Sequence, residues 1–133
     1  MPEPILTAET ILTTAVRNAL APYAGTHQGR PKVYYQVNTD GAPRPLLIFQ
    51  FQTDIGRIDH VGRIGATALV TVKAQADDPD TAVALLATAA PGMGALAYGG
   101  YTITAVYVRS PIIPPIDGVY QSAHIYRITL ERN

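Results

Sequence analysis

The chain has 133 residues, of which 47% are hydrophobic and 15% are charged, and ten basic residues balance ten acidic ones. This length suits one domain and is too short for two ordinary hydrophobic cores, while the zero net charge gives no overall attraction to nucleic acid or to an anionic membrane. The chain has no cysteine, which excludes disulfides, thiolate catalysis and cysteine-based metal sites.

The first half of the sequence predicts one helix and three strands. Apolar side chains recur every three or four positions over residues 7–20, so an amphipathic helix with Thr7 as its N-cap is predicted. Residues 32–37 are aromatic and β-branched, which is typical of a strand. Residues 45–52 begin as a continuous apolar run, which indicates a central strand buried on both faces. Residues 64–73 alternate and predict a third strand.

The second half predicts a helix and two more strands. Asp78 stands before a proline at the first helical position, so it is the expected N-cap of a helix that ends near residue 90. Residues 101–108 and 119–130 alternate between apolar and polar, as strands do. The expected fold is therefore α+β, one domain over residues 1–133 in the order α-β-β-β-α-β-β, with a mostly antiparallel sheet and two helices packed on one face.

Polar side chains that could perform chemistry gather in the linker between the second and third strands. These are Asp54, Arg57, Asp59, His60 and Arg63. The adjacent Asp59 and His60 could act as a general base or supply two metal ligands. Mixed charges in a long loop are nevertheless far more often solvated or part of an interface than catalytic. We therefore expect no catalytic, cofactor or metal site, and a protein that is not an enzyme.

The remaining motifs give no stronger sign of catalysis or of nucleic-acid binding. No serine lies in a nucleophile elbow, and no glycine-rich turn joins a strand to a helix as a phosphate-binding loop does. The basic residues are dispersed, so sequence-specific binding of nucleic acid is not expected. No run approaches the roughly 20 apolar residues of a membrane span, and the first residues do not resemble an export signal, so no membrane association is expected.

A proline-rich segment at residues 110–118 carries three isoleucines between the last two predicted strands. The prolines stiffen the segment, and its apolar side chains are costly to leave in water as a contiguous patch. It either folds back on the protein's own core or docks on a partner. The candidates for such a contact are Pro111, Ile112, Ile113 and Ile116.

Taken together, these elements resemble the tail terminator, or tail completion, proteins of long-tailed bacteriophages and of related gene-transfer particles. The resemblance covers nearly the whole chain as a pattern of elements. It rests on the opening helix that ends near Pro22, the strand around Tyr34, the proline-led strand at 45–51, the alternating strand that ends at Lys73, the helix at 78–90, and the sequence from Asp117 to Tyr120 that leads into the last strand.

The resemblance implies a structural virion protein that assembles in the host bacterial cytoplasm and lies at the head–tail joint of the tail. Six copies would form a ring that caps the tail tube, ends its polymerisation and offers a surface to the head connector or stopper protein. DNA would pass through the lumen of this homo-hexamer without sequence-specific binding. The family brings no catalytic residues and no cofactor.

Within such a ring, we expect residues 53–65 and 110–118 to contact the tube or a neighbouring subunit. Arg57 and Arg63 are candidates to pair with acidic groups across a subunit boundary, and Asp59 is one such group. Two alternatives stay open. One is another neck or head-completion ring subunit, and the other is a small-ligand-binding or enzymatic α+β domain that uses Asp54, Asp59 and His60.

Overall fold

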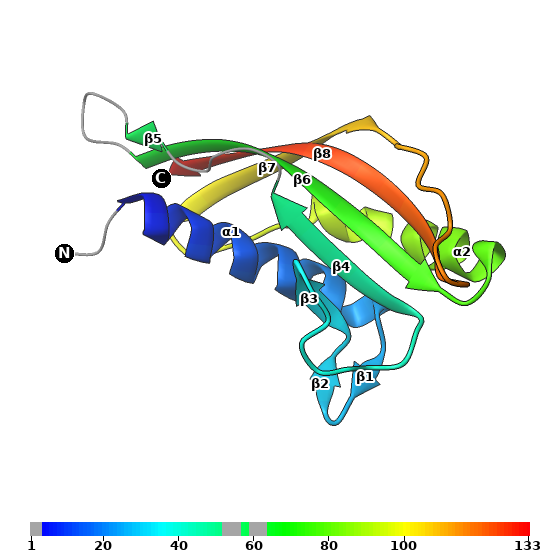
Figure 1. Cartoon of the computed structure of the whole chain (residues 1–133). Coiled ribbons are helices and arrows are strands. Elements are labelled where there is room, and N and C mark those ends of the chain that lie inside the picture. The colour runs from blue at the N-terminus through cyan, green and yellow to red at the C-terminus, as the bar shows by residue number, and fades with distance from the viewer. Residues whose placement is uncertain (1–3, 52–56, 59–63) are drawn as a thin grey trace.

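A computed structural model of the chain describes residues 4–51, 57–58 and 64–133, and in these ranges two helices lie against one face of a twisted sheet (Figure 1). The helices are α1 (Pro4–Leu20) and α2 (Pro79–Ala89). A short 3-10 turn follows each of them, η1 (Ala21–Tyr23) after α1 and η2 (Ala90–Gly94) after α2. The predicted α+β class and the predicted packing of both helices on one face are confirmed.

The main sheet has the strand order β3-β4-β6-β8-β7, and β5 pairs with β6 beside this path. Its strands are β3 (Val33–Tyr35), β4 (Leu46–Phe51), β5 (Arg57–Ile58), β6 (Ile64–Ala76), β7 (Tyr101–Arg109) and β8 (Tyr120–Arg132). Neighbouring strands of this sheet are antiparallel in the described part of the chain, except that β3 and β4 are parallel. Two further strands, β1 (Thr26–His27) and β2 (Arg30–Pro31), form a separate hairpin.

The structure differs from the predicted elements at the start of the first helix and at the strand around residues 32–37, and it adds a hairpin between them. Helix α1 begins at Pro4, so Thr7 lies inside the helix and is not its N-cap; proline suits the first helical position because its φ is fixed and no N–H partner is needed there. The loop after α1 contains the β1–β2 hairpin, whose turn places Gln28 and Gly29 at positive φ. Strand β3 is shorter than predicted, and it runs parallel to β4, which the sequence did not indicate.

The core lies between the helices and the inner face of the sheet. Alternate residues of the central strands point into it, and those buried most completely are Leu47, Phe49, Val70, Val72, Ile128 and Leu130. Helix α1 adds Leu12, Val16 and Leu20, whereas α2 adds mainly alanines around Leu86. Small side chains let α2 lie close to the sheet, and each fully buried leucine contributes about 1.5–3 kcal/mol.

On the outer face of the sheet, Thr71 of β6 and Ala123 and Ile125 of β8 are buried, and a loop covers the β3–β4 end. There the loop over residues 36–45 closes on a second apolar cluster of Tyr34, Ala42, Leu46 and Ile48. Because Leu46 to Phe49 are all buried, the prediction that the first half of this strand is buried on both faces is confirmed.

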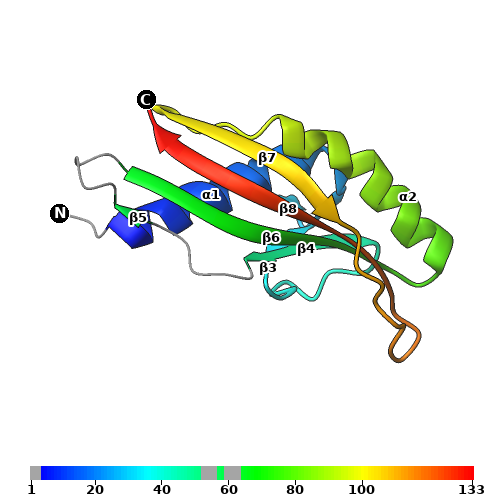
Figure 2. The ribbon, with the colours of Figure 1, turned by 90° about the horizontal axis from the view of Figure 1, so that it is seen from above.

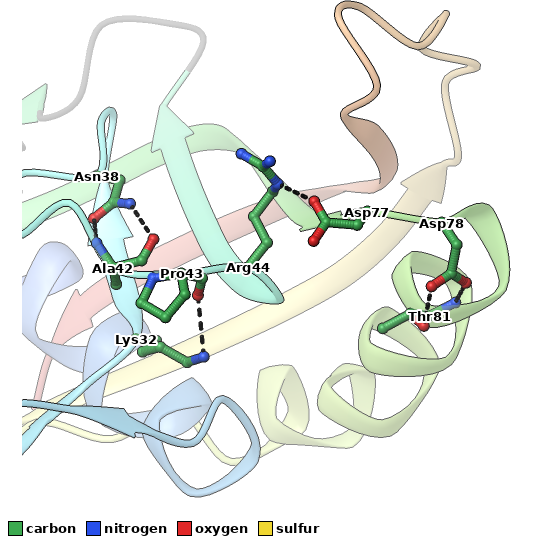
Figure 3. Close-up of polar contacts among 8 residues, drawn as sticks. All are labelled: Lys32, Asn38, Ala42, Pro43, Arg44, Asp77, Asp78 and Thr81. Atoms are coloured by element: carbon green, nitrogen blue, oxygen red, sulfur yellow. Dashed lines mark hydrogen bonds and ion pairs between the residues drawn. The ribbon is translucent and has the colours of Figure 1, made fainter.

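Polar contacts hold this loop in place (Figure 3). The Asn38 side chain and the Ala42 backbone exchange two hydrogen bonds of 3.0 and 3.1 Å, and Lys32 Nζ donates to the Pro43 carbonyl oxygen. Arg44 Nε binds Asp77 Oδ1 at 2.7 Å, which ties the loop to the end of β6.

Helix α2 begins as the sequence predicted. Asp78 Oδ1 accepts a hydrogen bond from the Thr81 backbone N–H at 2.8 Å, and Asp78 Oδ2 accepts one from the Thr81 hydroxyl at 2.7 Å (Figure 3). These hydrogen bonds to Thr81 lower the pKa of Asp78, because they stabilise its charged form. Asp78 thus caps α2, as expected.

Candidate interaction surface

Strand β7 forms one margin of the main sheet, and no described strand pairs with its outer edge (Figure 2). The opposite margin is β3, which is only three residues long, whereas β7 has nine. Large apolar side chains are exposed on β7: Val106 is 61% and Tyr107 54% exposed. Apolar exposure along a sheet edge is typical of a surface that contacts another protein.

A β-bulge interrupts β7 near its end. Tyr107 pairs with Tyr126 and Arg109 with Ile125, so Val108 is the additional residue. The predicted strict alternation therefore holds only as far as Tyr107. Beyond the bulge, Arg109 lies on the outer face of the sheet, together with Ile125.

The proline-rich segment forms an arm, defined here as residues 110–119. At its tip, Asp117 and Gly118 have φ angles of 52° and 75°. Ile116 and Val119 exchange backbone hydrogen bonds of 3.2 and 2.9 Å across these two residues, which makes a two-residue hairpin turn. An Asp-Gly pair suits this turn because both positions require positive φ.

The arm projects beyond the ends of β7 and β8 (Figure 2). Ile112 is 95% exposed and Ile116 65% exposed, while Pro111 and Ile113 are half-buried. Of the two outcomes expected for this segment, Ile112 and Ile116 do not fold back on the protein's own core. Whether all four residues contact a partner stays a prediction.

Three aromatic side chains meet where the arm leaves the sheet. The ring of His124 lies 5.4 Å from that of Tyr107 and 6.0 Å from that of Tyr126, each nearly edge to face. Tyr107 also shares a 2.6 Å hydrogen bond with the Ser110 hydroxyl, and His124 Nδ1 lies 3.1 Å from the Tyr126 hydroxyl. These contacts hold the base of the arm against β8.

Burial perturbs the titration of this cluster. It lowers the pKa of His124, since the charged imidazolium loses hydration there. It raises the pKa of Tyr126, and the nearby Tyr107 acts in the same direction. Burial thus favours the neutral imidazole, and His124 is a packed, hydrogen-bonding residue.

The structure leaves the charged linker untested. Asp54, Asp59, His60 and Arg63 lie outside the described residues. Arg57 begins β5, where its backbone pairs with Gly65, but its side chain is outside the description. In the ranges that are described, no three His, Asp or Glu side chains are grouped so as to hold a metal ion.

A cavity of about 270 Å³ lies between α1, the β1–β2 hairpin and β3. Its lining residues are Arg17, Arg30, Pro31, Val33, Tyr34, Thr39 and Asp40. Arg30 pairs with Asp40 at 3.0 Å, so the carboxylate is already neutralised. No sequence pattern indicates this cavity, because its residues come from separate elements that only the fold brings together.

The Tyr34 hydroxyl beside this cavity is buried, and no hydrogen bond of ordinary geometry reaches it. Burial raises its pKa, and the negative charge of Asp40 and hydrogen bonding to that carboxylate raise it further. A protonated phenol next to a paired carboxylate offers neither a base nor a nucleophile.

Helices long and apolar enough to cross a membrane do not occur in the described part of the chain.

Comparison with known proteins gives a likeness in fold. No family model matches the sequence, and no curated protein matches it. A chain in the solved structure described as "Virion of native gene transfer agent (GTA) particle" has a similar fold, with a TM-score of 0.63 and 21% sequence identity. The match covers 93% of this chain and 97% of that one, so the two share the fold along almost their whole lengths.

Proposed function

We propose that this chain is a structural virion protein, and that six copies form a ring which caps a tail tube and ends its polymerisation. The observation that carries the proposal is the likeness to a chain of a gene transfer agent virion, which spans both chains almost completely. A likeness confined to part of the chain would suit a shared module, whereas this one suits a protein with the same kind of task.

The surface of the molecule suits assembly better than catalysis. The arm presents Ile112 and Ile116 to solvent, and β7 presents Val106 and Tyr107. Exposed apolar patches of this kind favour contact with another protein. In a closed ring, one patch of each subunit binds a different patch of the next subunit, and the rotation from each subunit to the next brings the last one back to the first.

In this proposal the partners are other copies of the chain, the tail tube protein and the head connector or stopper. The arm and the linker over residues 53–65 would contact the tube or a neighbour, with Arg57 and Arg63 paired to acidic groups across the boundary. DNA would pass through the lumen at the head–tail joint, and the zero net charge suits a passage that does not retain it.

The test uses the purified chain and tail tubes assembled from the tube protein of the same particle. We expect rings of six 14.2 kDa subunits, about 85 kDa, at one end of each tube in electron micrographs, and tubes that no longer elongate. The double variant Ile112→Ser with Ile116→Ser should lose tube binding. The control Val83→Ser, on the exposed side of α2, should keep it.

Tubes that stay bare and continue to elongate with the unmodified chain would refute the proposal. Rings that bind the head connector but not the tube would refute the capping role and place the chain elsewhere in the neck. Unchanged capping after charge reversal at Arg57 and Arg63 would remove those two residues from the interface.

A further inference from the structure

The outer edge of β7 is open to pairing with another strand over most of its length, because its bulge lies near the end of the strand, at Val108. Proteins block exposed edges with proline or lysine, which cannot extend a ladder or are costly to bury. The arm that continues from β7 has three prolines, at 111, 114 and 115, but residues 101–108 contain neither proline nor lysine. Over this stretch β7 consists of β-branched and aromatic residues and one alanine, and no described strand pairs with the backbone groups at its outer edge.

We propose that β7 pairs antiparallel with β7 of a second copy of this chain, around a two-fold axis at Ala105. A two-fold axis perpendicular to the sheet places one residue opposite itself and keeps each face of the sheet continuous. Ala105 lies at the middle of the strand that spans Tyr101–Arg109. Because Val108 is the extra residue of the bulge, this register pairs the ladder from Thr102 to Arg109 and leaves Tyr101 beyond its end.

Charge complementarity favours this register. Because of the bulge, Arg109 takes an outer-face position that falls opposite Thr102 of the second copy. Within the second copy, Thr102 pairs with Glu131 of β8. Arg109 of the first copy therefore lies in the same row of side chains as this Glu131, and the two backbones are about two strand spacings of roughly 4.8 Å apart. Both Arg109 and Glu131 are exposed, and neither has an ion-pair partner among the described residues. Symmetry creates this pairing twice.

The apolar side chains of the edge fit the same register. Val106 falls opposite Thr104 on the outer face, and Tyr107 falls opposite Ile103 on the inner face. Val106 and Tyr107 are the two most exposed apolar side chains of β7, so the pairing covers the surface that is most costly to leave in water. Cross-strand pairs of an aromatic with a β-branched residue stabilise antiparallel ladders.

This pairing is independent of the ring proposed above. A two-fold contact uses the same patch on both subunits and closes at two copies, whereas a ring uses different patches head to tail. The β7 pairing would therefore cover the open edge of free subunits. When a subunit enters a ring, it would either keep the β7 contact beside the ring contacts or lose it. Failure of one proposal leaves the other testable.

The absence of cysteine gives a direct test of the register. In the variant Ala105→Cys, the two thiols face each other with Cα atoms about 4.5–5.5 Å apart, which lies within the range of a disulfide. We expect the oxidised variant to run as a covalent dimer on a non-reducing gel. The control Val83→Cys has its single thiol on an exposed position of α2, and we expect it to stay largely uncrosslinked. Light scattering of the unmodified chain should give about twice 14.2 kDa.

Two further variants test the edge without disturbing the core. Val106→Lys places a charge on the exposed edge and should return the protein to monomer, while Val83→Lys should not. Arg109→Glu and Glu131→Arg should each weaken the dimer, and together they should restore it. The proposal is overturned if the chain stays monomeric at high concentration. It is also overturned if the chain forms a dimer or hexamer in which the thiol of Ala105→Cys remains free, or a dimer that Val106→Lys leaves intact.

Discussion

Substitution of Gly92 by alanine tests the contact between η2 and the end of α1. Gly92 is buried, and a Cβ added there would lie 2.6 Å from the Ala19 carbonyl oxygen and 3.0 Å from Tyr23 Cε2. The tyrosine ring can shift by a few tenths of an ångström, but the carbonyl belongs to the backbone of α1 and cannot turn away. The substitution must therefore push α1 and η2 apart.

The expected cost is that of overpacking a well-filled site. Such insertions typically lower the free energy of unfolding by about 1–3 kcal/mol. With an unfolding entropy of roughly 2.1 cal/mol/K per residue, each kcal/mol corresponds to about 3–4 °C in a chain of this length. We therefore expect Gly92→Ala to lower Tm by about 3–11 °C, measured by circular dichroism and by urea denaturation.

Gly94 supplies a matched control two residues away. It is exposed, a Cβ there would meet nothing within 4 Å, and its φ is not in the left-handed region. Gly94→Ala should therefore leave stability unchanged or raise it by about 0.4–1 kcal/mol, because alanine restricts the unfolded chain. The reasoning is refuted if Gly92→Ala is as stable as Gly94→Ala, since the α1–η2 contact would then not be close.

Three further substitutions test individual side chains. Tyr34→Phe removes a buried hydroxyl that makes no hydrogen bond of ordinary geometry and lies beside the Asp40 carboxylate, so the free energy of unfolding should change by no more than about 1 kcal/mol. Because burial raises the Tyr34 pKa, stability should fall as pH rises above about 10, and Tyr34→Phe should reduce that fall. Burial lowers the His124 pKa, so its contribution to the free energy of unfolding should be fully present above about pH 6.5 and be lost as the pH falls below that value. In His124→Phe, the loss of stability on acidification should be less steep. Ile112→Ser, at a nearly fully exposed position, should change stability by less than about 0.5 kcal/mol.

Urea denaturation at a series of pH values checks these outcomes. A marked loss of stability in Tyr34→Phe would mean that the hydroxyl has a partner in solution. A pH profile that His124→Phe leaves unchanged below 6.5 would assign the acid sensitivity to other groups. A large loss in Ile112→Ser would show that the arm packs on the protein's own core.

Local chemistry was enough to predict the elements that depend on neighbouring residues. Asp78 before a proline predicts the start of α2 because capping involves only residues of the first turn. The continuous apolar run at Leu46–Phe49 predicts burial on both faces, which the loop over residues 36–45 and the core provide. Such signals lie within a few positions of each other, so one sequence suffices to read them.

The features that depend on distant residues could not be predicted in this way. The parallel pairing of β3 with β4 is set by the path of the chain over residues 36–45, which periodicity does not report. The bulge at Val108 depends on its register with β8, and strict alternation conceals it. The isoleucines of the arm were recognised as unusual, but only the fold decides whether they face the core or the solvent.

The paired strands β6 and β8 form a ladder that runs without interruption from Gly65 opposite Glu131 to Ala76 opposite Tyr120, a length of about 40 Å at roughly 3.4 Å per residue. The arm joins β8 at one end of this ladder, and β5 pairs with β6 at the other. The ladder therefore connects the arm and β5 through one continuous run of paired residues. A partner that binds the arm would thus also constrain the orientation of β5, because the two cannot turn independently without breaking backbone hydrogen bonds of this ladder.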